Sequence, residues 1–108
     1  MRWLTYLLIA ASTAALAADR EVAHYSGYFM YGFEVSLFRP VGSTERWWLV
    51  GSISIPCPLP TRSYIFLEVM GELSPKGKYG HQGLYDRQLG AVDFVSCRQV
   101  RNEELRGL

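Results

Sequence analysis

The chain has 108 residues, of which 49% are hydrophobic and 14% aromatic, and its formal net charge is +1. A nucleic-acid-binding domain of this size normally carries a clear cationic excess, and disordered chains are poor in aromatic residues, so the composition argues against both classes. We therefore expect one small globular domain with no nucleic-acid partner.

The amino-terminal stretch is the most apolar part of the chain. Fourteen of the first 18 residues are apolar, and the only charge among them is Arg2. Small residues at Ala15 and Ala17 are typical of the cleavage site of a secretory signal peptide. An uncleaved anchor is the alternative, but Thr5 and Ser12 interrupt a run shorter than the roughly 20 apolar residues that span a bilayer.

These features predict how the chain is divided and where it works. We expect a signal peptide over residues 1–17 and a single β-barrel domain over 18–108, with its core at about 23–100. The protein would be periplasmic or secreted, and it would meet the membrane only transiently, through the signal peptide.

Export also determines how the two cysteines are interpreted. In an oxidising compartment, Cys57 and Cys97 predict one disulfide, which would stabilise the domain by roughly 4 kcal/mol in the chain-entropy model. Two separate buried thiols are the alternative. No Cys-x-x-Cys motif points to redox catalysis.

The pattern after the leader indicates β-strands, because the apolar runs are short, aromatic or β-branched and bounded by glycine, proline or serine. The clearest is 25–38, where apolar residues alternate with others from Phe29 to Leu37. A strand of this length is expected to bend, and Gly27 and Gly32 are where it could do so.

Four further strands follow in chain order. Turn residues at 39–43 lead to a second strand at about 46–55, and three prolines then exclude a regular ladder from 56 to 60. The pattern predicts a third strand at 63–73, a glycine-rich loop at 74–83, and shorter strands over 84–89 and 91–100. The tail from 101 to 108 could form a helical turn or fray.

Five strands in about 80 residues, the first long and broken by glycine, favour an all-β fold that closes into a small five-stranded OB-like barrel. A two-sheet sandwich is the alternative. An OB fold normally places a helix between its third and fourth strands, where this chain is expected to have the glycine-rich loop.

Three parts of the chain carry a resemblance to a known group of proteins. The segment 27–40, the pair Trp47 and Trp48, and the segment 71–89 together resemble small bacterial envelope proteins with OB-like domains. More distantly, they resemble the carboxy-terminal domain of NlpE-like copper-response lipoproteins. The resemblance implies an envelope location and a binding or sensing role.

Few residues suggest catalysis or metal binding. His81 lies between glycines, but no nucleophile motif accompanies it. Glu34 and Glu68 lie among aromatic residues, where a buried acid needs a partner, and we expect Arg62 or Arg87 to provide one in a structural ion pair. The histidines, methionines and cysteines lack the close spacing of metal ligands, so we expect no metal, no other cofactor and no catalytic residue.

The adjacent tryptophans are the best indication of a binding surface. Neighbouring strand residues point to opposite faces, so one indole should stay partly exposed unless the 74–83 loop covers it. We expect ligand or partner binding on the tryptophan ridge and the following loop, at Trp47, Trp48, Tyr79, His81, Tyr85 and Arg87.

The function predicted from these observations is non-catalytic binding by an exported domain. The partner would be an envelope protein or a glycan, and the domain itself a monomer. Alternatives are a copper-sensing protein, a protein inhibitor and a small hydrolase.

Overall fold

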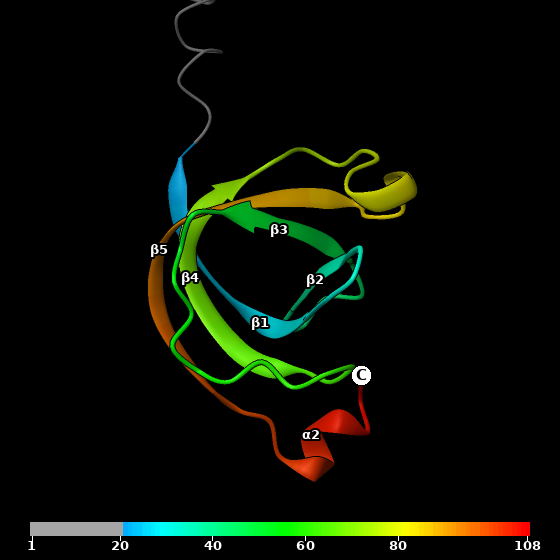
Figure 1. Ribbon diagram of the computed structural model, residues 1–108. Coiled ribbons are helices and arrows are strands. Elements are labelled where there is room, and N and C mark those ends of the chain that lie inside the picture. The colour runs from blue at the N-terminus through cyan, green and yellow to red at the C-terminus, as the bar shows by residue number, and fades with distance from the viewer. Residues whose placement is uncertain (1–20) are drawn as a thin grey trace, which may run out of the picture.

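The computed structural model describes residues 21–108, so the predicted signal peptide and its cleavage site lie outside the described residues. Figure 1 shows five strands arranged around a common centre, with one short 3-10 helix and one short α-helix. In chain order the elements are β1 (Val22–Gly32), β2 (Val35–Pro40), β3 (Trp47–Gly51), β4 (Ile65–Leu73), η1 (His81–Gly83), β5 (Arg87–Gln99) and α2 (Asn102–Leu105).

The strands form a closed barrel in the order β1-β2-β3-β5-β4. All neighbours are antiparallel except β3 and β5, which run parallel. This is the arrangement of an OB barrel, so the predicted fold class is confirmed. Closure leaves the sheet without a free edge along most of its length, which a domain this small needs in order to avoid edge-to-edge pairing.

The first predicted strand is wrong in one respect, because 25–38 is a hairpin of two strands. β1 pairs with β2 from Gly27 to Gly32, and a two-residue turn at Phe33 and Glu34 joins them. The turn lacks the usual asparagine or glycine, although Glu34 adopts a left-handed φ of 58°. A two-residue turn also changes which residues face inward, so Phe29 lies opposite Phe38 inside the barrel.

The two strands predicted at 84–89 and 91–100 are instead one strand, β5. Gly90 does not interrupt it, because this residue pairs with both β3 and β4. The register against β4 shifts twice, which leaves Val92 and Val95 without direct partners. Such bulges increase local twist, and they let β5 curl from its pairing with β3 into a long ladder with β4.

The connection between β3 and β4, residues 52–64, occupies the position at which an OB fold usually has a helix. Its three prolines prevent a regular ladder, and a disulfide between Cys57 and Cys97 ties it to β5, as predicted. Ile53 and Ile55 pack against the core from this segment. The glycine-rich loop, which was predicted to occupy the helix position, connects β4 to β5 instead.

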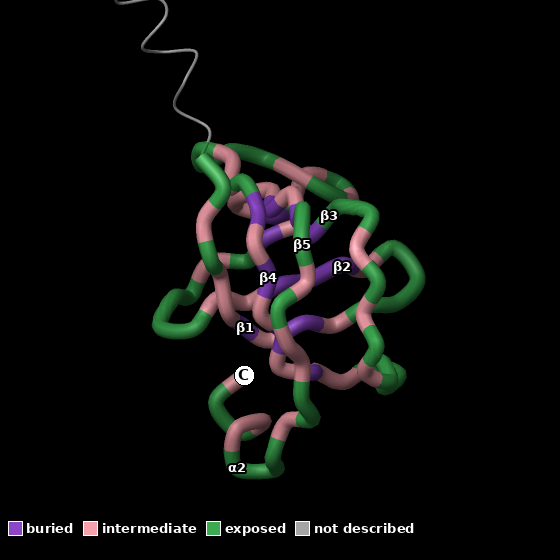
Figure 2. The backbone as a smooth tube through the Cα atoms, turned by 90° about the vertical axis from the view of Figure 1, so that its left-hand side faces the viewer, coloured by how far each residue is buried: buried purple, intermediate pink, exposed green. Residues whose placement is uncertain are grey.

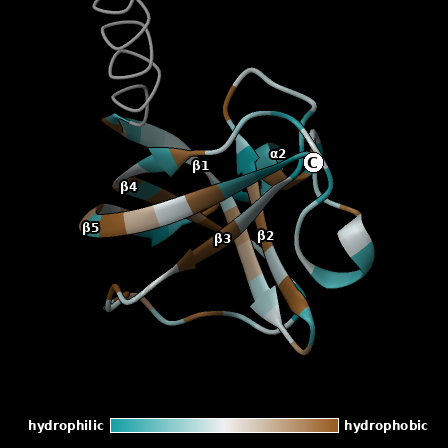
Figure 3. Cartoon of the chain, turned by 90° about the horizontal axis from the view of Figure 1, so that it is seen from above, coloured by the Kyte–Doolittle hydropathy of each residue, from teal (hydrophilic) through white to brown (hydrophobic). Residues whose placement is uncertain are grey.

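The core fills the barrel interior, and Figure 2 shows that the buried stretches lie on the strands while the connections are mostly exposed. The buried cluster comprises Phe29, Phe38, Trp47, Leu49, Ile65, Leu67, Val69, Leu89 and Ala91. In Figure 3 the strands carry much of the hydrophobic colour, whereas η1 is drawn mainly in white and teal. Five inward faces therefore supply a single core.

The chain ends in a helical turn, α2, that is fastened to the barrel by one acid. Glu104 accepts hydrogen bonds from the Tyr28 hydroxyl at 2.8 Å and from the Arg98 guanidinium at 2.8 and 3.0 Å. These bonds, Arg98 foremost, hold the pKa of the Glu104 carboxyl well below its usual range. No helix within residues 21–108 combines the length and the apolar character needed to cross a membrane.

Candidate binding site

Trp47, the first of the predicted site residues, belongs to the core. Its side chain is buried, its ring stacks on Phe38 at 5.8 Å between centroids, and Tyr25 meets it edge-on at 5.4 Å. The indole N–H donates to Glu45 Oε1 at 2.9 Å, which satisfies its only polar atom. Trp47 therefore offers no surface to a ligand.

Trp48 faces outward, and the loop between β4 and β5 packs against it and leaves it half-buried, so one indole does stay partly exposed as predicted. Its ring meets the buried ring of Tyr85 edge-on at 4.8 Å between centroids. Gly80 lies so close that a Cβ added there would sit 2.5 Å from the Trp48 ring, and its φ of 68° also favours glycine. The loop thus packs on the outer face of β2 and β3, where Leu37 is buried beside Trp48.

Hydrogen bonds make this loop an ordered extension of the sheet. Tyr79 and Tyr85 exchange backbone bonds at 3.0 and 3.1 Å, and the Tyr79 hydroxyl donates to the Pro75 carbonyl at 2.9 Å. Asp86 accepts from the Arg46 backbone N–H at 2.8 Å. Tyr79 and Tyr85 therefore hold the loop together rather than converging on an open site.

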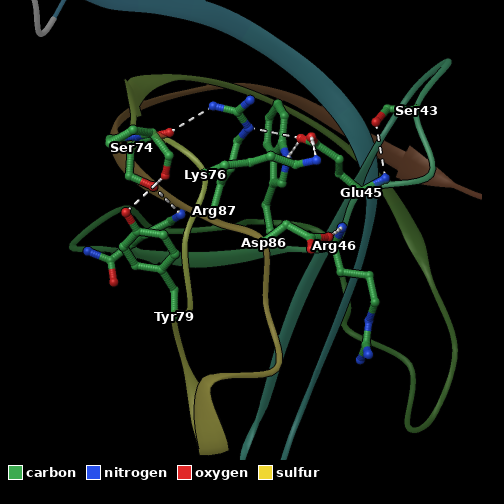
Figure 4. Close-up of polar contacts among 11 residues, drawn as sticks. Ser43, Glu45, Arg46, Ser74, Lys76, Tyr79, Asp86 and Arg87 are labelled. Carbon is green, nitrogen blue, oxygen red and sulfur yellow. Dashed lines mark hydrogen bonds and ion pairs between the residues drawn. The ribbon is translucent and has the colours of Figure 1, made fainter.

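Arg87 belongs to the polar network that anchors the loop, which Figure 4 shows. Its guanidinium donates to Glu45 Oε1 at 2.9 Å and to the Ser74 carbonyl at 3.1 Å, and Lys76 lies 3.6 Å from the second Glu45 oxygen. The hydrogen bond from Trp47, followed by that from Arg87, lowers the pKa of the Glu45 carboxyl.

The two acids singled out in the sequence pair with histidines, so the prediction of Arg62 or Arg87 as partner is wrong. His81 Nε2 lies 3.1 Å from Glu34 Oε2, and His24 Nε2 lies 2.9 Å from Glu68 Oε2. The outward orientation of these acids brings them to imidazoles on the barrel surface. The first contact joins the tip of the loop to the β1–β2 turn, so the loop spans the outer face of β2 and β3.

The second pair does not have the geometry of a hydrolase triad. The Ser96 hydroxyl donates to Glu68 Oε1 at 2.8 Å, so the carboxylate lies between the hydroxyl and the imidazole. In a triad the imidazole stands between the other two and accepts the proton of the nucleophile. Within residues 21–108, no three His, Cys, Asp or Glu side chains are grouped closely enough to hold a metal ion.

A different region of the barrel is open, at the end where β1 turns into β2. β2 and β3 share only two ladder pairs, Leu37 with Trp48 and Phe38 with Trp47. Beyond them, the Ser36 hydroxyl donates to the Leu49 carbonyl at 2.6 Å. A side chain thus bridges the strands at the point where their ladder stops.

Two adjoining cavities lie at this end, and we call them together the mouth cleft. The first, of about 300 Å³, has a floor of core residues and a wall from the 52–64 segment; its lining includes Phe29, Tyr31, Ser36, Leu49, Ile53 and Leu59. The second, of about 540 Å³, lies between the β1–β2 turn and residues 59–62 and includes Phe33, Pro60, Thr61 and Arg62. Tyr31 and Leu59 line both.

The rim of the mouth cleft carries large apolar side chains in solvent. Phe33 is 90% exposed, Tyr31 58% and Leu59 41%. None of these residues was predicted as a site residue, because the continuous strand expected at 25–38 placed Phe33 and Tyr31 on a core face. A turn at Phe33 and Glu34 would have been the signal, but these residue types are rare in tight turns.

Comparisons with protein-family models, curated proteins and solved structures find no match to this chain.

Proposed function

We propose that this domain is a non-catalytic binding module of an exported protein and that its ligand occupies the mouth cleft. The observation that carries the proposal is the exposure of Phe33 and Tyr31 beside a cavity whose floor is the apolar core. Concave apolar sites of about 300–1,000 Å³ are typical of small-molecule binding, and exposed apolar patches commonly mark contact surfaces.

The packing around Trp48, the alternative site, supports the choice of the mouth cleft. Trp48 is packed against Tyr85 and Gly80, and backbone hydrogen bonds and the Tyr79 hydroxyl hold the loop above it. An aromatic platform for stacking on sugars or bases would need an accessible ring face. The mouth cleft has accessible rings, most of its lining side chains are apolar, and the Ser36 hydroxyl already donates to the Leu49 carbonyl. These features favour an apolar ligand over a glycan.

The arrangement of the histidines supports binding rather than hydrolysis. Each imidazole contacts a carboxylate, and the one nearby hydroxyl, that of Ser96, is bonded to the acid. None of these imidazole, carboxylate and hydroxyl groups lines the mouth cleft. The exposed apolar rim of Tyr31, Phe33 and Leu59 offers no ligands that copper prefers, and the cavity behind it favours a small ligand.

A periplasmic or secreted location is part of the same proposal. The disulfide between Cys57 and Cys97 is the kind of link that persists in oxidising compartments. The apolar leader supplies a signal for export. The disulfide and the apolar leader are features independent of the cleft, and both are consistent with a ligand that is bound outside the cytoplasm.

An uncharged fluorescent probe tests the proposed site. We expect N-phenyl-1-naphthylamine to bind the purified protein with enhanced emission, and Leu59→Ser to weaken that binding by about fivefold to tenfold, because burying a leucine contributes about 1.5–3 kcal/mol and this one is partly exposed.

Leu84→Ser is the matched control, since Leu84 is 59% exposed but does not line the cleft. Equal effects of the two substitutions, or no binding by the parent protein, would contradict the proposal.

A further inference from the structure

One charged residue, Arg62, lines the mouth cleft at its outer end. Among residues 21–108 no other Lys, Arg, Asp or Glu lines either cavity. None of the ion pairs and side-chain hydrogen bonds found within residues 21–108 includes Arg62. By contrast, Arg87 and Arg98 are bonded to acids. An unpaired guanidinium beside an apolar cavity can accept an external anion.

The backbone holds Arg62 in an uncommon conformation. Its φ of 56° lies in the left-handed region, which non-glycine residues seldom adopt. Pro60 stands two positions earlier, and the disulfide at Cys57 ties the same segment to β5. Pro60 and the disulfide restrict the segment that carries Arg62, and such restriction reduces the entropy lost when a ligand binds.

The two cavities differ in character along the length of the mouth cleft. The inner one is lined by core residues and by Ser36, whose hydroxyl is already bonded. The outer one, which shares Tyr31 and Leu59 with the first, ends at Thr61 and Arg62. A ligand that fits both needs an apolar body for the inner part and a polar, anionic end for the outer part.

We propose, building on the proposed function of the mouth cleft, that its ligand is a single-chain amphiphile with a carboxylate head group. The chain lies between Phe29 and Leu59, and the carboxylate meets Arg62. A planar guanidinium matches a carboxylate in bidentate geometry, and one cation balances one monoanion. The Thr61 hydroxyl on the same rim is a further donor for the head group.

Competition against the uncharged probe tests the head group separately from the chain. We expect decanoate, used below its critical micelle concentration, to displace N-phenyl-1-naphthylamine at about fivefold to tenfold lower concentration than decanol, because the guanidinium donates charge-assisted hydrogen bonds to the carboxylate, weakened by the exposure of Arg62 to solvent. Decylammonium should compete more weakly than decanol.

Substitution of the cation assigns the preference to a residue. Arg62→Gln should bring decanoate to the level of decanol without changing decanol itself, while Arg62→Lys should keep part of the preference. Lys78→Gln is the control, because Lys78 is an exposed cation outside the cleft and should have no effect.

The outcomes separate the two proposals. If decanoate and decanol compete equally with the parent protein, the head-group inference is wrong while the cleft stands as a binding site. If Arg62→Gln weakens both ligands alike, the residue shapes the cleft and does not recognise the anion, which also overturns the inference. If the probe itself does not bind, or if a dimer that Phe33→Ser dissociates already fills the cleft, the proposed function fails.

Discussion

The two sides of this barrel use aromatic residues in opposite ways. On the outer face of β2 and β3, Trp48 and Tyr85 are packed under a loop whose backbone and side chains are hydrogen-bonded. At the β1–β2 end, Phe33 and Tyr31 stand in solvent beside a cavity. Aromatic content alone therefore does not identify a binding surface, because the polar anchoring of the neighbouring segment decides whether the rings are covered.

The same contrast holds for the charged groups. On the covered side, Glu45 joins Trp47, Arg87 and Lys76 in one network (Figure 4). At the open end, Arg62 has no acid beside it among the described residues. Paired charges stabilise the loop, whereas an unpaired one is available to a ligand.

Removal of the disulfide should have the largest effect, because it fastens one wall of the open end. The double substitution Cys57→Ala and Cys97→Ala should lower the free energy of unfolding by about 4 kcal/mol, since the bond closes a loop of 40 residues. It should also weaken probe binding at temperatures where the variant stays folded. Urea denaturation measures the first effect. Two titratable thiols per chain in the native protein would show that the bond does not form.

A pair of glycine substitutions tests how tightly the loop between β4 and β5 is held against Trp48. Gly80 and Gly83 have similar φ values, 68° and 66°, but a Cβ would lie 2.5 Å from Trp48 at the first and 3.4 Å from Lys78 at the second. Gly83→Ala should cost about 1–2 kcal/mol for the left-handed backbone alone. Gly80→Ala should cost about 1–3 kcal/mol more, because the ring must move and because the ψ of −160° at Gly80 lies in a region that essentially only glycine adopts.

Tryptophan emission during urea denaturation follows both glycine variants. The expected result is a larger loss for Gly80→Ala together with a native-state change in emission as Trp48 becomes exposed. Equal losses would mean that the loop does not pack on Trp48.

Acid should weaken the covered side through Glu45, with a smaller effect. The folded protein holds the Glu45 pKa below its ordinary value of 4.5, so the unfolded chain binds more protons between the two values. The stability that this carboxylate contributes is complete above pH 4.5 and is lost as the pH falls through the lowered pKa.

Glu45→Gln is the test of that pH dependence. The melting temperature of the variant should lie below that of the parent near neutral pH, and the difference should shrink as the pH falls to about 3. Glu72→Gln is a suitable control, because no ion pair of the described residues includes Glu72. A difference between parent and Glu45→Gln that is independent of pH would contradict the role of the ionised carboxyl.

The sequence allowed the fold class and the disulfide to be predicted, but not the division into strands. Alternating aromatic and β-branched residues identify strands wherever they occur, and two cysteines allow one pairing. The turn at Phe33 and Glu34 could not be found in this way, because apolar residues alternate with others straight through it and these two residues carry no turn signal. Gly90 led to the opposite error. A glycine is typical of a break between two strands, but Gly90 lies within one strand and pairs with both β3 and β4.

The candidate site was harder to predict, for a geometric reason. The tryptophan pair is visible in one dimension, but its cover is a loop that begins 26 positions later, at Ser74. The mouth cleft combines residues near 29–36, 49–55 and 59–62, which meet only because the barrel closes. Arg62 is one arginine among several in the sequence, and its lack of a partner is visible only in three dimensions.

Mapping of the ligand by nuclear magnetic resonance tests the central claim most directly. Decanoate should be titrated into uniformly ¹⁵N-labelled protein while backbone amide shifts are followed. If decanoate binds in the mouth cleft, we expect saturable shifts at Tyr31, Phe33, Leu59 and Arg62, with little change at Tyr79 and Tyr85. Shifts centred on Trp48 and the 74–86 loop, with none at the mouth cleft, would contradict it.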